Sequence, residues 1–179
     1  MNSWLSWTVP PAIVMTAASP LMAAQYMTVE QAQKAAFPDA VKFTPADVIF
    51  TPDQAKAIEQ LTGQKLMVRG EQVWKVEDKS GQAGYFILDY VIGKHLIIDY
   101  AVSLSPQGAV RKVDILEYRE SYGGEVAGAD WLDQFKGKTP SDSMEPGEDI
   151  RIISGATLSS RHVTEGVKKV LAIYAVCLK

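Results

Sequence analysis

The sequence predicts an α+β fold, an antiparallel β-meander packed with helices, and three observations lead to this prediction. Two capping-box motifs mark short helices in the N-terminal third of the chain. Residues 66–119 are rich in Val, Ile, Tyr and Phe and carry short connections of the hairpin type. The last third ends in an apolar stripe of helical period, as on a helix that packs against a core.

Length and composition narrow the class of protein. The chain has 179 residues, of which 47% are apolar and 22% are charged, so we expect one globular domain rather than a disordered chain. The formal net charge is −3 and the Lys and Arg residues are scattered, so we expect no nucleic-acid partner. Cys177 is the single cysteine, which excludes an internal disulfide, and with His95 and His162 far apart we expect no metal site.

The first 24 residues predict a targeting segment. No charged side chain appears before Glu30, and the apolar run ends in small residues at Ala23 and Ala24. Three prolines within the run argue against an unbroken membrane-spanning helix. We therefore expect a signal peptide over residues 1–24 and a periplasmic or otherwise extracytoplasmic domain over 25–179. An uncleaved N-terminal membrane anchor and a cytoplasmic apolar tail are the alternatives.

Two helices are predicted before the β region. Thr28 and the Gln three residues later form a capping box, and the helix ends by Phe37 because a proline follows. Thr51 opens a second helix with proline at the first helical position. This helix runs to about Leu61, with Gly63 as its left-handed cap.

Four strands are predicted next, over residues 72–77, 84–92, 95–104 and 110–118. Their connections are too short for crossover helices, so the strands pair antiparallel as hairpins, and His95 is expected in a turn. A glycine-rich nucleotide-binding fingerprint is also missing, which excludes a dinucleotide-binding parallel sheet.

Two helices are predicted in the last third. A short one begins with Asp130 as its N-cap and runs through Phe135 to a stop at Gly137. A polar loop follows, and its acidic residues Glu145, Glu148 and Asp149 are expected to be solvated, or else to steer a basic partner. The final helix carries one apolar stripe, predicted to face the core, made of Val163, Val167, Val170, Leu171, Tyr174 and Leu178.

The start of the final helix is the candidate site. Hydroxyl and small residues gather there, in the order Ser154, Gly155, Ala156, Thr157, Leu158, Ser159 and Ser160. A helix N-terminus offers N–H donors without partners and a partial positive charge, which suits a phosphate group. His162 follows on the first turns, either as a phosphate contact or as a surface residue. From these residues alone, a hydroxyl-rich helix cap without a ligand is the alternative.

This stretch resembles the flavinylation motif of the FMN-binding domain family. That family occurs in FMN-carrying extracytoplasmic subunits of sodium-pumping quinone reductases and Rnf-type complexes, and in small exported flavoproteins. Three further segments resemble the family in the same order along the chain, residues 36–40, 119–124 and 131–138.

The resemblance implies a covalent cofactor. In the family, a separate flavin transferase that uses FAD esterifies the threonine after Gly-Ala to the phosphate of FMN, which points to Thr157 here. The neighbouring motif residues Ser154, Gly155, Ala156, Leu158, Ser159 and Ser160 are then candidates for cofactor binding. The loop residues Glu120, Ser121, Tyr122 and Gly123 are further candidates, with Tyr122 and Trp131 as candidate stacking partners for the flavin ring. For Trp131, packing in the core is the alternative.

The function implied is that of an exported electron carrier rather than a stand-alone enzyme. Its redox partner would be a cytochrome or a quinone-linked membrane protein. Two departures from the family pattern are present: Arg151 stands where the family has Asp six residues before the threonine, and Ser121-Tyr122 replaces Thr-Pro. The alternatives are therefore a non-flavinylated binding module of the same fold, and an FMN subunit of a membrane redox complex.

Overall fold

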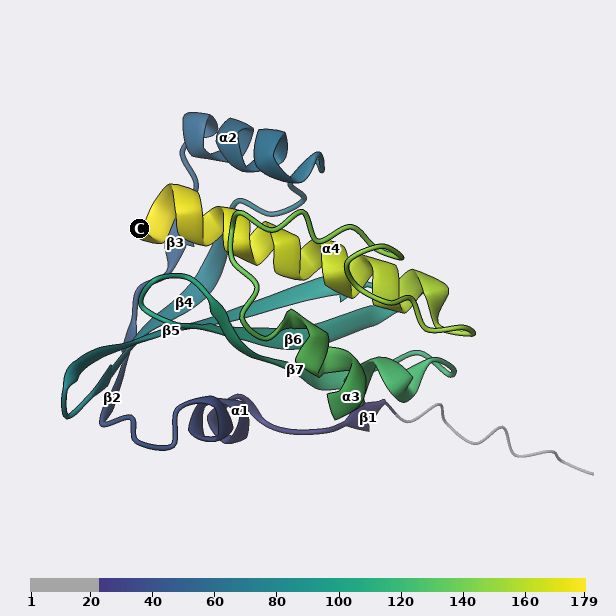
Figure 1. The fold of residues 1–179 in the computed structure, drawn as a ribbon, viewed down its shortest axis with the longest axis horizontal. Helices are drawn as coiled ribbons and strands as arrows, with labels where there is room; N and C mark the ends of the chain where they lie inside the picture. Colours follow the sequence, from purple (N-terminus) through teal and green to yellow (C-terminus); the bar gives the residue numbers. More distant parts are fainter. Residues whose placement is uncertain (1–22) are drawn as a thin grey trace, which may run out of the picture.

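The computed structural model describes residues 23–179, so nearly all of the predicted targeting segment lies outside the described residues. The chain forms one antiparallel sheet of order β1-β7-β6-β5-β4-β2, with β3 paired to β4 (Figure 1). The strands are β1 (Ala24–Gln25), β2 (Lys42–Pro45), β3 (Val48–Ile49), β4 (Gly70–Asp78), β5 (Gly81–Ile92), β6 (Ile97–Leu104) and β7 (Val110–Tyr118). The predicted α+β meander is confirmed, because β4 to β7 follow one another as neighbours.

Helices cover both faces of the sheet. The helical segments are α1 (Val29–Ala36), α2 (Pro52–Thr62), η1 (Gly124–Ala127), α3 (Ala129–Leu132), η2 (Asp133–Phe135), α4 (Thr157–Ile173) and η3 (Tyr174–Leu178). Figure 1 shows α4 across one face and α1 below the other, with α2 on the outer side of α4.

Both N-terminal helices begin as predicted. Thr28 and Thr51 each accept a hydrogen bond from the backbone N–H three residues later, and the Gln at that position accepts from the N–H of the threonine. Gly63 ends α2 in the left-handed region, at φ 71°. The capping signals in the sequence therefore located both helices.

Three short strands were not predicted. β1, β2 and β3 have two to four residues each, and they pair only with the outer sides of β7 and β4. Strands this short carry too few positions for an alternating pattern, so tertiary pairing rather than local sequence defines them.

The predicted cap of the short helix was wrong. The N-cap of α3 is Gly128 and not Asp130, which lies inside the helix, and no side chain caps the helix. The chain passes from η1 into α3 through Gly128, so the turn from one helix to the next fixes the start of α3. Gly137 has a φ of 81° beyond η2, as expected of a glycine that stops a helix.

The main core lies between α4 and the sheet. Val163, Val167 and Val170 are fully buried, and Leu171 and Tyr174 nearly so, while Leu178 is partly buried. The predicted stripe of the final helix is thus confirmed. Each large apolar side chain buried in this way stabilises the fold by about 1.5–3 kcal/mol.

The order of the strands brings three distant segments to one end of the sheet. β5 and β7 both run antiparallel to β6, so they run parallel to each other and their C-terminal ends lie at the same end of the sheet. The turn after β5 and the loop after β7 therefore lie at that end of the sheet, and the start of α4 lies beside them.

Candidate functional site

A pocket of about 500 Å³ opens at this end of the sheet, beyond the C-terminal ends of β5 and β7. Its walls come from the β5–β6 turn, the loop after β7 and the first turn of α4. The lining residues are Lys94, His95, Glu120, Ser121, Tyr122, Gly155, Ala156, Thr157, Leu158 and Ser159. The volume falls within the range of about 300–1,000 Å³ that is usual for sites that bind small molecules and cofactors.

Two predicted segments meet in this pocket. Of the motif at the start of α4, Gly155, Ala156, Thr157, Leu158 and Ser159 line it, and so do Glu120, Ser121 and Tyr122 from the loop. The sequence resemblance had associated these segments across more than thirty positions, and the structure places them side by side.

The first turn of α4 has no side-chain cap. Its N-cap is Ala156, whose side chain carries no hydrogen-bonding group, whereas α1 and α2 both begin with a capping threonine. Gly155 turns the chain into the helix at a φ of 86°, and Thr157 is exposed as the first helical residue. The N–H groups of this turn are therefore open to a ligand from the pocket.

Ser160 has a different place. It is fully buried, its hydroxyl lies 2.9 Å from the carbonyl oxygen of Ala156, and the N–H of Ile153 donates to the same hydroxyl at 3.3 Å. These bonds fasten the preceding chain to the helix. Ser160 thus stabilises the motif from inside, and Ser154 lies in the exposed turn before the helix, outside the lining of the pocket.

Gly123 and Tyr118 join the loop to the helix. Gly123 has a φ of 89°, and a Cβ atom there would lie 2.7 Å from the hydroxyl oxygen of Tyr118 and 2.8 Å from the Cβ of Ala156. The Tyr118 hydroxyl donates to the carbonyl of Tyr122 and lies 3.1 Å from the Ser159 hydroxyl. Desolvation raises the pKa of Tyr118, which keeps this hydroxyl protonated at neutral pH.

Sequence reasoning did not single out Tyr118. Its side chain lies on the α4 face at the end of β7, directly before the glycine-bearing loop, and it is buried. Strict alternation from Val113 and Ile115 would have placed Tyr118 on the opposite face, and a register shift in the pairing of β7 with β6 returns it to the α4 face. The contact with Ser159 depends in addition on the position of α4.

Glu120 holds the neighbouring turn. Its carboxylate accepts hydrogen bonds from the backbone N–H groups of His95 and Leu96, the second at 2.8 Å. Desolvation alone would raise the pKa of Glu120, but these backbone donors outweigh it and lower the pKa below the usual value. The carboxylate is therefore ionised and occupied by protein donors.

His162 holds the same turn from the helix. Its Nδ1 lies 2.6 Å from the carbonyl oxygen of Ile92 and 3.1 Å from that of Gly93. Two carbonyl acceptors at Nδ1 assign the ring proton to that nitrogen. The turn that carries Lys94 and His95 is thus fixed from two sides.

Trp131 lies in the core and not at the pocket. Its exposed fraction is 5%, its ring packs edge-on against Phe135 at 5.2 Å between centroids, and its Nε1–H donates to the carbonyl of Arg151 at 2.7 Å. Burial against η2 explains why the structure does not bring Trp131 to the other candidate residues. Tyr122, in contrast, is 85% exposed at the rim.

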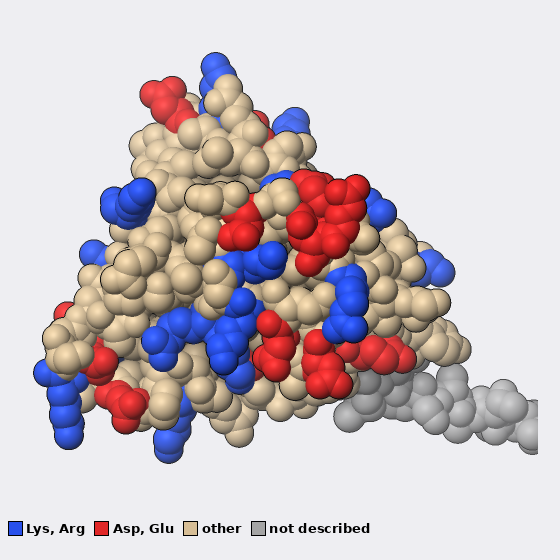
Figure 2. All heavy atoms as spheres, viewed as in Figure 1, with Lys and Arg blue, Asp and Glu red and all other residues tan. Residues whose placement is uncertain are grey.

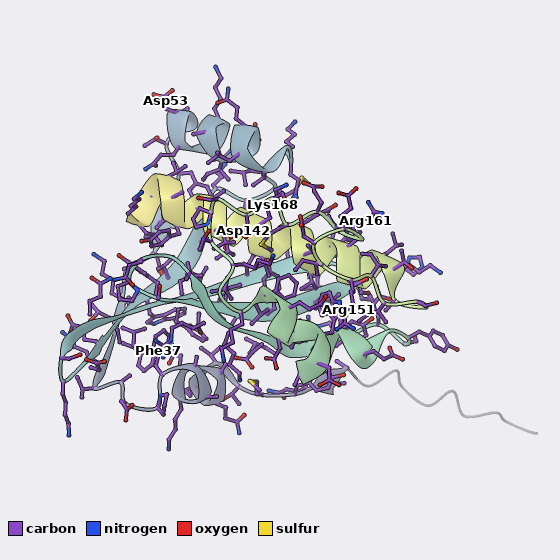
Figure 3. The ribbon with its side chains drawn as sticks, in the orientation of Figure 1. Phe37, Asp53, Asp142, Arg151, Arg161 and Lys168 are labelled. Atoms are coloured by element: carbon purple, nitrogen blue, oxygen red, sulfur yellow. The ribbon has the colours of Figure 1, made fainter. Side chains whose placement is uncertain are left out.

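Arg151 fastens the chain before the motif to α3 and η2. Its Nε donates to Gln134 Oε1 at 3.1 Å, and a terminal nitrogen donates to the carbonyl of Asp130 at 3.3 Å. Figure 3 shows Arg151 beside α3. The position that departs from the family pattern is therefore used for packing between this segment and α3.

The loop after η2 carries exposed acidic side chains. Figure 2 shows Asp and Glu side chains gathered where the loop after η2 crosses α4, and this loop exposes Glu145, Glu148 and Asp149. Lys168 on α4 pairs with Glu145 at 2.7 Å.

Within residues 23–179, no three His, Cys, Asp or Glu side chains converge as metal ligands would. Among the helices of that same part, none combines the length and apolar character of a membrane span.

Comparison with known proteins bears on this site. Residues 93–172 match the FMN-binding domain family, which confirms the resemblance for this part of the chain and includes all three walls of the pocket. One component of the Na(+)-translocating ferredoxin:NAD(+) oxidoreductase complex of Acetobacterium woodii is 25% identical over 145 residues, 73% of this chain and 69% of that component. The crystal structure of Shewanella oneidensis NqrC is similar with a TM-score of 0.48 and 23% identity, over 73% of this chain and 65% of that one.

Proposed function

Because the chain carries an FMN-binding domain over residues 93–172, we propose that the protein is an electron-transfer flavoprotein with FMN esterified through its phosphate to Thr157. The observation that carries this proposal is the first turn of α4. It has no cap of its own, and it presents an exposed threonine to the pocket.

The residues of the pocket fit such a group. The open N–H groups and the dipole of a 17-residue helix favour a phosphate at this place. Gly155 and Ala156 leave room for a phosphate to approach the backbone, and Ser159 lines the same pocket while its hydroxyl bonds Tyr118. Tyr122 supplies an exposed aromatic face at the rim, where a flavin ring could stack.

The chain would hold and orient the cofactor, and the flavin would supply the redox chemistry. In the attachment reaction, the Thr157 hydroxyl oxygen attacks the FMN phosphate of FAD, AMP leaves, and the hydroxyl proton is released. A flavin transferase is therefore a partner for maturation. The covalent ester would keep the cofactor on a protein that works where free flavin is scarce.

An extracytoplasmic place and a membrane-linked redox partner are part of the proposal. The apolar N-terminal segment supports the first. The similarity to a component of a membrane redox complex supports the second, and the acidic loop offers a docking charge for a basic partner such as a cytochrome.

The test is the mass of the protein produced together with a flavin transferase. We expect a gain of one FMN less one water, mapped to the peptide with Thr157, and yellow fluorescence on a denaturing gel. Thr157→Ala should abolish the gain, whereas Ser141→Ala, which removes an exposed hydroxyl outside the pocket, should retain it. Covalent flavin on the Thr157→Ala protein would refute the assignment.

A non-flavinylated binding module is the second candidate, and Arg151 favours it. The side chain stands at the family's acidic position and is bonded to α3 and η2. If the transferase reads an acidic residue there, Arg151→Asp should increase the flavin yield several-fold. An unmodified wild-type mass in a host that flavinylates other proteins would favour this candidate.

A further inference from the structure

We infer that the β5–β6 turn is a third wall of the cofactor site, on which Lys94 and His95 meet the negative charge of the flavin phosphate while Glu120 and His162 act as positioning residues. This inference rests on the proposed function. Both Lys94 and His95 line the pocket that contains Thr157, and both are exposed within it.

The turn is held firmly for a hairpin tip. At the C-terminal side of the turn, Glu120 accepts hydrogen bonds from two backbone N–H groups. At the N-terminal side, His162 bonds two backbone carbonyls. At Gly93 a Cβ atom would lie 2.8 Å from Glu120 Oε1, so the carboxylate packs closely against the turn. Glu120 belongs to the loop after β7 and His162 to α4, so these two positioning residues come from the other two walls of the pocket.

The charges in the pocket are suited to an anion. Lys94 supplies a positive charge, and His95 gains one on protonation. Glu120 is the carboxylate beside them, but it faces the backbone N–H groups of the turn, which partly compensate its charge. The helix end on the opposite wall adds its own positive potential.

The test is the pKa of His95, measured by NMR on the full chain with and without attached flavin. A phosphate near the ring should lower the proton dissociation constant of His95 about fivefold, the effect of one opposite charge at about 4 Å in water. The chain has two histidines, and His162, bonded to backbone carbonyls, is the internal control that should not shift. Mass spectrometry at Thr157 reports the loading of each sample.

The positioning role has its own pair of variants. In Glu120→Gln the amide oxygen still accepts from the turn, so the shift of His95 on loading should be retained and the Leu96 N–H should stay protected from hydrogen exchange. In Glu120→Ala both the shift and the protection should be lost.

The outcomes separate the two proposals. A loaded protein in which the pKa of His95 is unchanged overturns the inference and leaves the flavin at Thr157 in place. Equal shifts in Glu120→Gln and Glu120→Ala overturn the positioning role. A wild-type chain that takes no flavin from an active transferase overturns the proposed function, and the inference with it.

Discussion

The hydroxyl groups of Tyr118 and Ser159 lie 3.1 Å apart although 41 positions separate the two residues in the chain. Since the Tyr118 proton is donated to the carbonyl of Tyr122, the Ser159 hydroxyl is the donor in this pair. One phenol oxygen thus joins the end of β7, the loop behind it and the first turn of α4.

Replacing this phenol should loosen the pocket. Tyr118→Phe removes both hydrogen bonds and leaves the aromatic packing, so we expect a loss of about 1–2 kcal/mol in the free energy of unfolding. The yield of covalent flavin should fall with it. Urea unfolding and flavin fluorescence on a denaturing gel measure the two effects.

Tyr85→Phe is the matched control. Its hydroxyl donates to the carbonyl of Leu178, away from the pocket, so stability should fall by a similar amount while the flavin yield stays unchanged. Equal flavin yields in the two variants would show that the Tyr118 hydroxyl has no role in the site.

The close approach at Gly123 makes a second prediction. Gly123→Ala places a Cβ at positive φ and against Ala156 and Tyr118, so the loop and α4 must move apart. We expect a loss of more than about 1 kcal/mol in stability and a marked drop in flavin yield. Gly137→Ala has a similar φ of 81° but no atom within 4 Å of its Cβ, and it should cost stability without affecting the yield.

A buried charged cluster under α4 predicts how stability depends on pH. Lys169 Nζ lies 2.7 Å from Asp89 Oδ1 and 3.1 Å from Glu71 Oε1, and Tyr100 donates to Asp89. Burial, reinforced by the charge of Asp89, raises the pKa of Glu71 from 4.5 to about 7. Between these values the folded protein keeps a proton that the unfolded chain releases.

The free energy of unfolding should therefore fall as the pH rises from about 4.5 to about 7, by as much as about 3 kcal/mol from this group alone. Above pH 7 the contribution of Glu71 becomes constant. Glu71→Gln should remove this slope, and Glu77→Gln is the exposed control on the same strand. Urea unfolding at several pH values checks the difference, and parallel curves for wild type and Glu71→Gln would contradict it.

Gly166 gives a fourth prediction, about the packing of α4. A Cβ atom there would lie 2.1 Å from the Tyr100 hydroxyl oxygen and 3.0 Å from Val91, so Gly166→Ala must displace the helix or the tyrosine. We expect a loss of about 1–3 kcal/mol in the free energy of unfolding. Thermal unfolding measures it, and the loss should be smaller when Gly166→Ala is made in a Tyr100→Phe background. A stabilised Gly166→Ala protein would contradict this description of the contact.

Local signals predicted most of the fold and part of the site. The capping boxes at Thr28 and Thr51 and the stripe of α4 act within a few residues, so the sequence alone located them. The edge strands and the cap of α3 depend on pairing and on turns between elements, which local patterns do not encode. For the site, the motif around Thr157 and the loop at Glu120 could be associated only through the family resemblance.

Other parts of the site depend on where β5 and β7 end. Lys94 and His95 looked like ordinary turn residues, and their place in the pocket follows from the parallel direction of the two strands. Glu120 was predicted to bind the cofactor, whereas its carboxylate bonds the backbone of the turn. Trp131 matched a sequence pattern, but its partners are Phe135 and the Arg151 carbonyl.

The three walls of the pocket come from segments that are remote in the chain and are held together by Tyr118, Glu120 and His162. A nascent or misfolded chain carries the threonine motif but has no pocket around it. An enzyme that recognises the assembled pocket would modify only molecules in which the sheet and α4 have packed together. The bound flavin would then mark the molecules that have completed folding, and the flavin absorbance would report the folded fraction of the protein.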